Sequence, residues 1–191
     1  MEKPATRPYR HGNVPNAMRA AAREILDEEG VDAVGLREAA RRVGVSATAA
    51  YRHFASKEDL LASVAAEGFG ELSATLEKAL NGSDPLLGLG LAYVEFALRK
   101  KGLFRLMFGP LLVDRARYPG LNNAAGATMA LIQRATAAAQ ARPDEQDAGA
   151  MATWGLVHGI SSLFIDGLVP EENARGMAEQ ILARAGMTTT A

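Results

Sequence analysis

Apolar residues recur every three or four positions along most of this chain, a spacing typical of helices with one buried face. The first such stripe lies within residues 14–29 and ends at Gly30, a residue type that readily closes a helix. Its members are Val14, Met18, Ala21 and Ile25. No segment shows the sustained alternation of apolar and polar residues that marks a half-buried strand. The pattern therefore predicts an all-α fold.

Glycine, proline, asparagine and serine residues punctuate this pattern and divide the rest of the chain into further helices. Asn81-Gly82-Ser83 and Gly109-Pro110 mark two of the breaks, and Pro170 marks another. We expect one helical segment over residues 36–43 and a second that begins at residue 46. Further helical segments are expected over residues 56–80, 85–102, 103–108, 121–141, 145–168 and 171–185. Residues 111–119 are expected to form a loop or one loose turn.

Two short helical patterns joined by residues 44–46 form the most informative stretch of the chain. Gly44 suits the left-handed conformation of a helix C-cap, and Ser46 can cap the next helix by accepting a backbone N–H. The apolar positions that would pack the two helices together are Leu36, Ala40, Val43, Ala50 and Phe54. This spacing predicts a helix-turn-helix, whose second helix enters the major groove of DNA.

The outward face of the second helix combines small, polar, aromatic and cationic side chains, which suit a groove lined by base edges and phosphates. The predicted DNA-binding residues are Arg37, Ser46, Ala47, Thr48, Tyr51, Arg52, His53 and Lys57. Ala47 and Thr48 can contact thymine methyl groups, and Arg52 can pair with guanine. The members assigned mainly to phosphate are Tyr51, His53 and Lys57, the last beside a helix start at Ser56 that resembles a capping box.

The net charge of −1 at pH 7 argues weakly against a nucleic-acid binder, but the charges are unevenly placed. Residues 1–23 and residues 37–57 each carry a net charge of +4. An acidic cluster lies between them and hides both in the total; its members are Asp27, Glu28, Glu29 and Asp32. We therefore expect two basic patches flanking the second helix of the motif, as phosphate contact requires.

The stretch VGVSATAAYRHFASKEDLL, with RPYRHGNV upstream, resembles the TetR family of transcriptional regulators from about Tyr9 to Leu61. Residues 154–167, WGLVHGISSLFIDG, are similar to a C-terminal domain of that family named for its Trp-His-Gly pattern. The resemblance implies an all-helical homodimer. Its DNA-binding domain is expected over residues 1–61, and a C-terminal domain that binds an inducer and dimerises is expected over residues 62–191.

The chain departs from the family pattern at Gly35, Ala39 and Ala50. Gly35 stands where the family usually has a serine or threonine that caps the second helix and often touches phosphate. Ala39 and Ala50 are smaller than the usual isoleucine and leucine. We therefore expect a thinner core in the DNA-binding domain.

Residues 1–13 are polar and contain proline and glycine, and we expect this segment to be disordered in the free protein. A basic arm of this kind can reach into an adjacent minor groove when it orders on DNA. The side chains expected to do so are Arg7, Tyr9, Arg10 and His11.

With 48% hydrophobic and 23% charged residues, the chain has the composition of a soluble globular protein. It contains no cysteine, which excludes disulfides and thiolate metal sites. Its three histidines lack paired-ligand spacing, so we expect no metal and no other cofactor. The N-terminal residues lack the apolar core of a signal peptide, and no later run approaches a membrane span. We expect a cytoplasmic protein.

Eight of the eleven aromatic residues follow residue 61. Each of these residues alone is more simply explained as part of the hydrophobic core. The family resemblance implies that together they line a pocket for an apolar or aromatic effector. The residues expected to line it are Phe69, Tyr93, Phe96, Phe104, Met107, Phe108, Trp154 and His158. The pattern does not specify which of them face a cavity and which face the core.

Small residues form a stripe along one face of segment 145–168, at steps of four and three residues, and they are Ala148, Ala152, Gly155, Gly159 and Ser162. Glycine inside a helix costs about 1 kcal/mol relative to alanine, so two on one face indicate close packing against another helix. That helix can belong to the same chain or to a second subunit. The family dimerises through its last two helices, so we expect a dimer contact from Ala152 to Ser162.

His158, Ser162 and Asp166 share one helix face, which raises the possibility of a hydrolytic triad. A triad needs histidine between the nucleophile and the acid, whereas serine is the middle member here. We therefore expect no enzyme. The leading interpretation is a homodimeric repressor that a small molecule releases from a palindromic operator in double-stranded DNA. The alternative is a ligand-independent architectural or activating DNA-binding protein.

Overall fold

The computed structural model describes residues 13–139 and 146–187, and within them the chain forms nine α-helices, two 3₁₀ turns and no strand. The helices are α1 (Val14–Glu29), α2 (Leu36–Val43), α3 (Ala47–Tyr51), α4 (Lys57–Ala79), α5 (Pro85–Arg99), α6 (Lys101–Phe108), α7 (Pro119–Ala139), α8 (Gln146–Ile165) and α9 (Ala174–Arg184). The turns are η1 (Pro110–Leu112) and η2 (Arg115–Arg117). The prediction of an all-α fold is confirmed.

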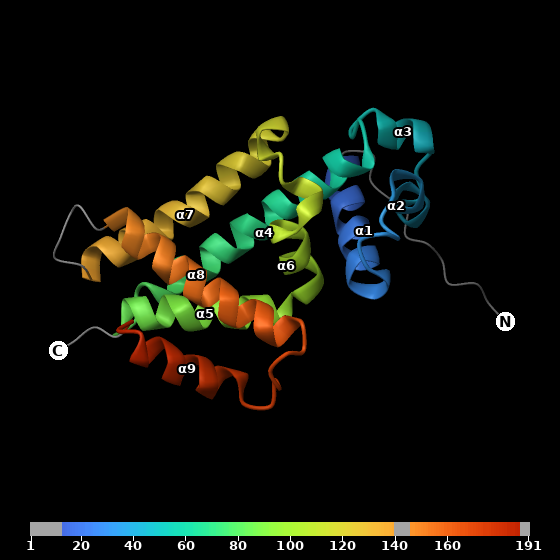
Figure 1. Cartoon of the computed structure of the whole chain (residues 1–191). Coiled ribbons are helices and arrows are strands. Elements are labelled where there is room, and N and C mark those ends of the chain that lie inside the picture. The colour runs from blue at the N-terminus through green and yellow to red at the C-terminus, as the bar shows by residue number, and fades with distance from the viewer. Residues whose placement is uncertain (1–12, 140–145, 188–191) are drawn as a thin grey trace.

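Helices α1, α2 and α3 gather at one end of the molecule, where α2 and α3 form the helix-turn-helix (Figure 1). Ala39, Ala40 and Ala50 are all buried there, so the contact between α2 and α3 is made largely by small side chains. Gly44 has a φ of +77° and closes α2, with its N–H directed at the carbonyls of the preceding turn. Gly35 leaves the start of α2 without a side-chain cap, as its identity predicts.

Helix α4 runs from this end into the rest of the molecule and packs against α1, α5, α6 and α7 (Figure 1). Its predicted cap is confirmed: Ser56 Oγ accepts the Asp59 N–H at 3.2 Å, and Asp59 Oδ2 accepts the Ala55 N–H at 3.0 Å. The helix continues through residues 61 and 62. The two expected domains therefore share one helix, and the boundary between them is not a linker.

The C-terminal bundle is built from α5, α7, α8 and α9, with α6 between it and α1. Two glycines allow close helix contact. An added Cβ at Gly68 of α4 would lie 2.7 Å from Met107 Sδ of α6, and one at Gly90 of α5 would lie 2.8 Å from Leu182 Cδ1 of α9. Both glycines therefore serve packing between helices that are distant in sequence.

Several helix ends differ from the expected ranges. The segment expected over 85–102 ends at Arg99, because Lys100 leaves the helical region with φ −131° and ψ 48°, and α6 begins at Lys101. The final helix begins at Ala174, three residues later than expected. The expected loop over 111–119 contains two 3₁₀ turns.

One prediction about apolar segments was wrong. A 19-residue window of α8, Asp147–Ile165, has a mean hydropathy of 1.3 and is long and apolar enough to cross a membrane by length and composition alone. The helix nevertheless packs against α5 and α7. Its lack of charge has a structural reason, since one face belongs to the core and another carries the stripe of small residues. One such helix does not indicate a membrane protein.

Candidate DNA-binding surface and effector cavity

Helix α3 presents the predicted reading face to solvent. Ser46 caps it, with Oγ accepting the Ala49 N–H at 3.1 Å, and Ala50 is buried on the opposite side. The predicted contact residues on the outward side are all exposed, and they are Ser46, Ala47, Thr48, Tyr51, Arg52 and His53. The helix therefore has one buried side and one side open to a groove.

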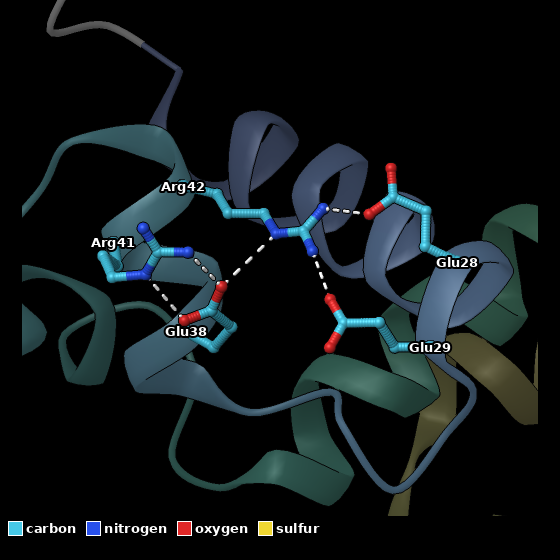
Figure 2. Close-up of polar contacts among 5 residues, drawn as sticks. All are labelled: Glu28, Glu29, Glu38, Arg41 and Arg42. Atoms are coloured by element: carbon cyan, nitrogen blue, oxygen red, sulfur yellow. Dashed lines mark hydrogen bonds and ion pairs between the residues drawn. The ribbon is translucent and has the colours of Figure 1, made fainter.

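Part of the basic charge expected around the motif is neutralised among the described residues, because Arg41 and Arg42 of α2 pair with glutamates. The guanidinium of Arg42 lies among Glu28, Glu29 and Glu38, with N–O distances of 2.7, 2.5 and 3.4 Å (Figure 2). Arg41 forms two further hydrogen bonds with Glu38, at 2.8 and 2.6 Å. The acidic end of α1 thus lies against the arginines of α2 and cancels much of their charge.

These contacts also hold Glu38 in its charged form. The hydrogen bond from Arg41, which outweighs the cost of desolvation and is assisted by Arg42, lowers the pKa of Glu38 to about 2. The ionised carboxylate of Glu38 bonds two arginines of its own helix, and one of them, Arg42, also pairs with Glu28 and Glu29 of α1. The network therefore joins α1 to α2.

The other arginines near the motif divide into paired and unpaired groups. Arg19 and Arg23 of α1 form ion pairs with Glu67 and Glu71 of α4 and so join the two helices. Arg37 and Arg52 are exposed and form no ion pair with the described part of the chain. These two are the arginines of the predicted surface that remain available to phosphate or base.

Lys57 has a partner within the protein. Its Nζ donates to the backbone oxygen of Asp32 at 3.0 Å, and this bond ties the start of α4 to the loop between α1 and α2. The ammonium has two further N–H donors, so this hydrogen bond does not prevent contact between Lys57 and a phosphate. The predicted arm residues, Arg7, Tyr9, Arg10 and His11, lie outside the described residues.

Ring side chains from α4, α5, α6 and α8 meet in one group. We call this group the aromatic cluster, and its members are Phe69, Tyr93, Phe104, Phe108, Trp154 and His158. The ring of Phe108 lies within 6.4 Å of each of the other five, measured between centroids. Phe108 is therefore the central ring, and it is also the last residue of α6.

A hydrogen-bonded chain crosses the aromatic cluster. Trp154 Nε1 donates to Tyr93 Oη at 3.2 Å, and Oη lies 3.1 Å from His158 Nδ1. The indole N–H can only donate, so the hydroxyl accepts it and is free to donate to Nδ1. Burial lowers the pKa of His158 and raises the pKa of Tyr93, which favours a neutral imidazole and a protonated hydroxyl.

Two cavities meet at Phe108. The α6–α8 cavity, of about 320 Å³, has aromatic and charged residues in its lining, among them Phe104, Arg105, His158 and Asp166. The second, of about 280 Å³, has walls from α4, α5, α7 and α8. We call it the Arg115 cavity after the one arginine in its lining. Since Phe108 lines both, a change in its rotamer would alter the two cavities together.

Six of the eight predicted pocket residues form the aromatic cluster, and each of them lines at least one of these cavities. The remaining two line neither. Phe96 is buried with Lys100 Nζ 5.6 Å from its ring centroid, and Met107 packs against Gly68 of α4. These two side chains belong to the helix packing.

The sequence did not indicate the polar wall of the Arg115 cavity, which contains Arg115, Asn122 and Thr128. Arg115 lies on η2, in a segment expected to be a loop, where a cation is ordinarily solvated. Two members of the triad considered from the sequence have other partners: Asp166 pairs with Arg105 at 3.1 Å, and His158 lies within hydrogen-bond distance of Tyr93. Among the described residues, no hydrogen bond joins Ser162 to either of them.

The stripe of small residues on α8 has no cover within the described chain. Ala152, Gly155 and Gly159 are exposed, and an added Cβ at either glycine would meet nothing within 4 Å. Met151 and Leu163, on the same helix, are 56% and 45% exposed. Of the two partners left open by the sequence, a helix of the same chain is therefore excluded for the described residues.

Two family models match the chain, one in its N-terminal part and one in its C-terminal part. Residues 19–64 match the bacterial regulatory proteins of the tetR family, and residues 86–185 match the tetracyclin repressor-like C-terminal domain. The first match covers α2, α3 and most of α1, and the second runs from α5 into the end of α9. The longer match alone covers more than half of the chain.

The relatives agree with these matches. An uncharacterized HTH-type transcriptional regulator of Bacillus subtilis, YobS, is 30% identical over 87 residues, which are 44% of this chain and 46% of that protein. A solved protein of unknown function from Rhodococcus sp. RHA1 is 30% identical, with a TM-score of 0.80 over 97% of this chain and 100% of its own. A tetR-family regulatory protein from Rhodococcus RHA1 shares the fold at 22% identity and TM-score 0.66, over 94% and 99% of the two chains. This chain belongs to the TetR family of DNA-binding transcriptional regulators.

Proposed function

We propose that this regulator is a homodimeric repressor and that a small, apolar or aromatic molecule releases it from its operator. The observation that carries the proposal is α6, which contacts both the DNA-binding end and the cavities. Phe108 lines both cavities, and Gly102 of the same helix packs under α1. An added Cβ at Gly102 would lie 3.3 Å from Leu26 O and from Asp27 Oδ1. A molecule that displaces Phe108 therefore moves α6 against α1.

Release requires that the effector bind the arrangement unsuited to DNA more tightly than the arrangement suited to it. From the sequence, α4 is the covalent connection expected to carry the change. The contacts add a second route: Glu71 of α4 pairs with Arg23 of α1 and with Lys100, which directly precedes α6. One carboxylate thus joins three elements that would have to move together.

At the DNA, we assign base contacts to Ala47, Thr48 and Arg52 and phosphate contacts to Tyr51, His53 and Arg37. Their shared exposure beside the capped start of α3 supports this assignment. Ser46 and Lys57 stand at the starts of α3 and α4, where backbone N–H groups favour an approaching phosphate.

Two copies of the chain supply the two reading helices of a palindromic operator. A single recognition helix contacts only a few base pairs, and symmetry brings a second helix to the other half-site. The uncovered stripe on α8, with exposed Met151 and Leu163 on the same helix, supports a subunit contact in which another helix approaches Gly155 and Gly159 closely.

A matched pair of variants tests whether a molecule in the Arg115 cavity controls DNA binding. Gly126 of α7 lines that cavity, and an added Cβ there would meet nothing within 4 Å. Gly126→Leu should narrow the cavity, whereas Gly126→Ala adds only one methyl group. The operator is first selected from random duplexes, and apolar and aromatic compounds are screened by thermal shift. Operator affinity is then measured by fluorescence anisotropy.

We expect some compounds to stabilise both the wild type and Gly126→Ala, and to lower the affinity of both proteins for the operator. The same compounds should change neither the thermal stability nor the operator affinity of Gly126→Leu. Compounds that stabilise the protein through this cavity and leave operator affinity unchanged would support the ligand-independent alternative. An unchanged response of Gly126→Leu would place the binding site elsewhere.

A further inference from the structure

Arg115 is a half-buried cation in the wall of an otherwise uncharged cavity. Its Nη2 donates to the backbone oxygen of Met107 at 2.9 Å, and the guanidinium carbon lies 5.1 Å from the ring centroid of Phe69. These two contacts hold the guanidinium at the edge of the aromatic cluster. They use only part of its capacity, since a guanidinium carries five N–H donors.

Among the described residues, the other partly buried arginines are each paired with a carboxylate. Arg19 has Glu67, Arg23 has Glu71, and Arg42 has three glutamates. Within the described residues, Arg115 forms no ion pair and only hydrogen-bonds to a neutral carbonyl. Burial lowers the pKa of Arg115, the direction expected when a cation is desolvated without a counter-charge. A half-buried charge of this kind is most stable when an anion approaches it.

The rest of the Arg115 cavity fits an anion with an apolar body. No aspartate or glutamate lines the cavity, so a negative ligand group would meet no like charge in its walls. Asn122 offers a polar group, and Met129, Ile132 and Trp154 offer apolar surface. Asn122 and Gly126 are exposed to solvent, so the cavity is accessible from the α7 side.

We propose that the effector is an organic acid whose carboxylate binds Arg115 and whose apolar or aromatic body lies against Met129, Ile132 and Trp154. This inference rests on the proposed effector function and narrows its ligand class. A planar carboxylate matches the fork of a guanidinium and carries a single charge, which one arginine can balance. Arg115 already holds the last turn of α6 through Met107, so the bound carboxylate would be linked directly to the helix that contacts α1.

The test compares an acid with its neutral isostere. The probes are 4-phenylbutanoate and 4-phenylbutanamide, which share the same carbon skeleton and differ in charge. Trp154 is the only tryptophan of the chain and lines the cavity, so its fluorescence reports binding without a label. The variants are Arg115→Gln and Arg115→Lys, with Arg117→Gln as a control that removes an exposed cation from the same turn. Circular dichroism establishes that each variant is folded.

We expect the wild type and Arg117→Gln to bind the acid more tightly than the amide. In Arg115→Gln the affinity for the acid should fall by about tenfold to hundredfold, while affinity for the amide is unchanged. The affinity of Arg115→Lys for the acid should lie between those of the wild type and Arg115→Gln, because lysine keeps the charge but lacks the planar guanidinium. Equal binding of acid and amide by the wild type, or a preference that survives in Arg115→Gln, would overturn the inference.

The outcomes also separate this inference from the proposed function. If the amide and other neutral compounds bind near Trp154 and lower operator affinity, the effector function stands and the carboxylate assignment is wrong. If neither probe changes Trp154 fluorescence and no screened compound lowers operator affinity, both are wrong.

Discussion

Arg52 differs from Arg41 and Arg42 in having no carboxylate partner within the described residues. An arginine that is already paired must exchange one anion for another when it meets a phosphate, so its net gain is small. An unpaired, exposed arginine exchanges only water and mobile counterions. We therefore expect the contribution of each arginine to DNA binding to depend on its ion-pair partners as well as on its position in the motif.

The first prediction compares Arg52→Ala with Arg41→Ala. Arg52→Ala should lose preference for the operator over a scrambled duplex, by about 1–3 kcal/mol if Arg52 pairs with guanine. Arg41→Ala should change that preference little, because Arg41 is held by Glu38. Titrations at several salt concentrations provide the measurement. Equal weakening of Arg52→Ala on every sequence would assign Arg52 to phosphate.

The second prediction concerns acid. Because the folded-state pKa of Glu38, about 2, lies below its ordinary value of 4.5, its contribution to stability is complete above pH 4.5 and is lost as pH falls toward about 2. Wild-type thermal unfolding should therefore depend more steeply on pH in this window than that of Glu38→Gln.

The control for this experiment is Glu77→Gln, which removes an exposed carboxylate of α4 that forms no ion pair with the described residues. Its pH dependence should follow the wild type. If Glu38→Gln and Glu77→Gln show the same slope, the network around Glu38 does not contribute to stability.

The charged residues could be counted from the sequence, but which of them lie next to each other in the folded chain could not be predicted. Glu28 and Arg42 are separated by a helix end, a loop and most of α2, and only the packing of α1 on α2 brings them to 2.7 Å. Arg115 shows the same limit. In sequence it lies between Pro110 and Pro119 and looks like a solvated loop residue, while in the structure it lines a cavity.

At the scale of elements, the sequence predicted a helix boundary correctly where the residues at that boundary start or stop a helix by themselves. Helix α1 spans the predicted residues, because Pro15 in its first turn and Gly30 after its last are start and stop signals in themselves. The break at Lys100 has no such signal. There the side chain binds Glu71 and lies over Phe96, and neither contact can be read from neighbouring sequence.

The third prediction tests the crossing of α4 and α6 with two valines. Gly68→Val places side-chain atoms where Met107 and Leu103 already lie, whereas Gly70→Val on the same helix points into open space. Helix propensity affects both variants alike, so their difference isolates packing. We expect Gly68→Val to be less stable than Gly70→Val by about 1–3 kcal/mol in urea unfolding. Equal stability would show that α6 adjusts freely at this crossing.

At the scale of the whole molecule, the fourth prediction concerns the dimer. Gly159→Leu adds a bulky side chain to the uncovered face of α8 without a clash inside the described chain. If this face meets a second subunit, overpacking costs about 1–3 kcal/mol and two-fold symmetry repeats it. We expect a helical protein that sediments as a monomer and binds the operator weakly.

The matched control is Gly70→Leu, which enlarges an exposed glycine of α4 and should remain dimeric. A Gly159→Leu protein that sediments as a dimer and binds normally would move the subunit contact away from the stripe. The next place to examine would then be α9, where Met177 is 39% exposed.

The uncovered stripe on α8 has a consequence for how operator occupancy depends on the concentration of the chain. With dimerisation as a condition of operator binding, the concentration of DNA-competent protein rises with the square of the chain concentration while monomers predominate. A logarithmic plot of operator occupancy against chain concentration should then have an initial slope of about two. Growth and division dilute the chain, so repression would be lost more abruptly than the protein itself. The glycines of α8 would in this way set a threshold of expression below which the operator is left open.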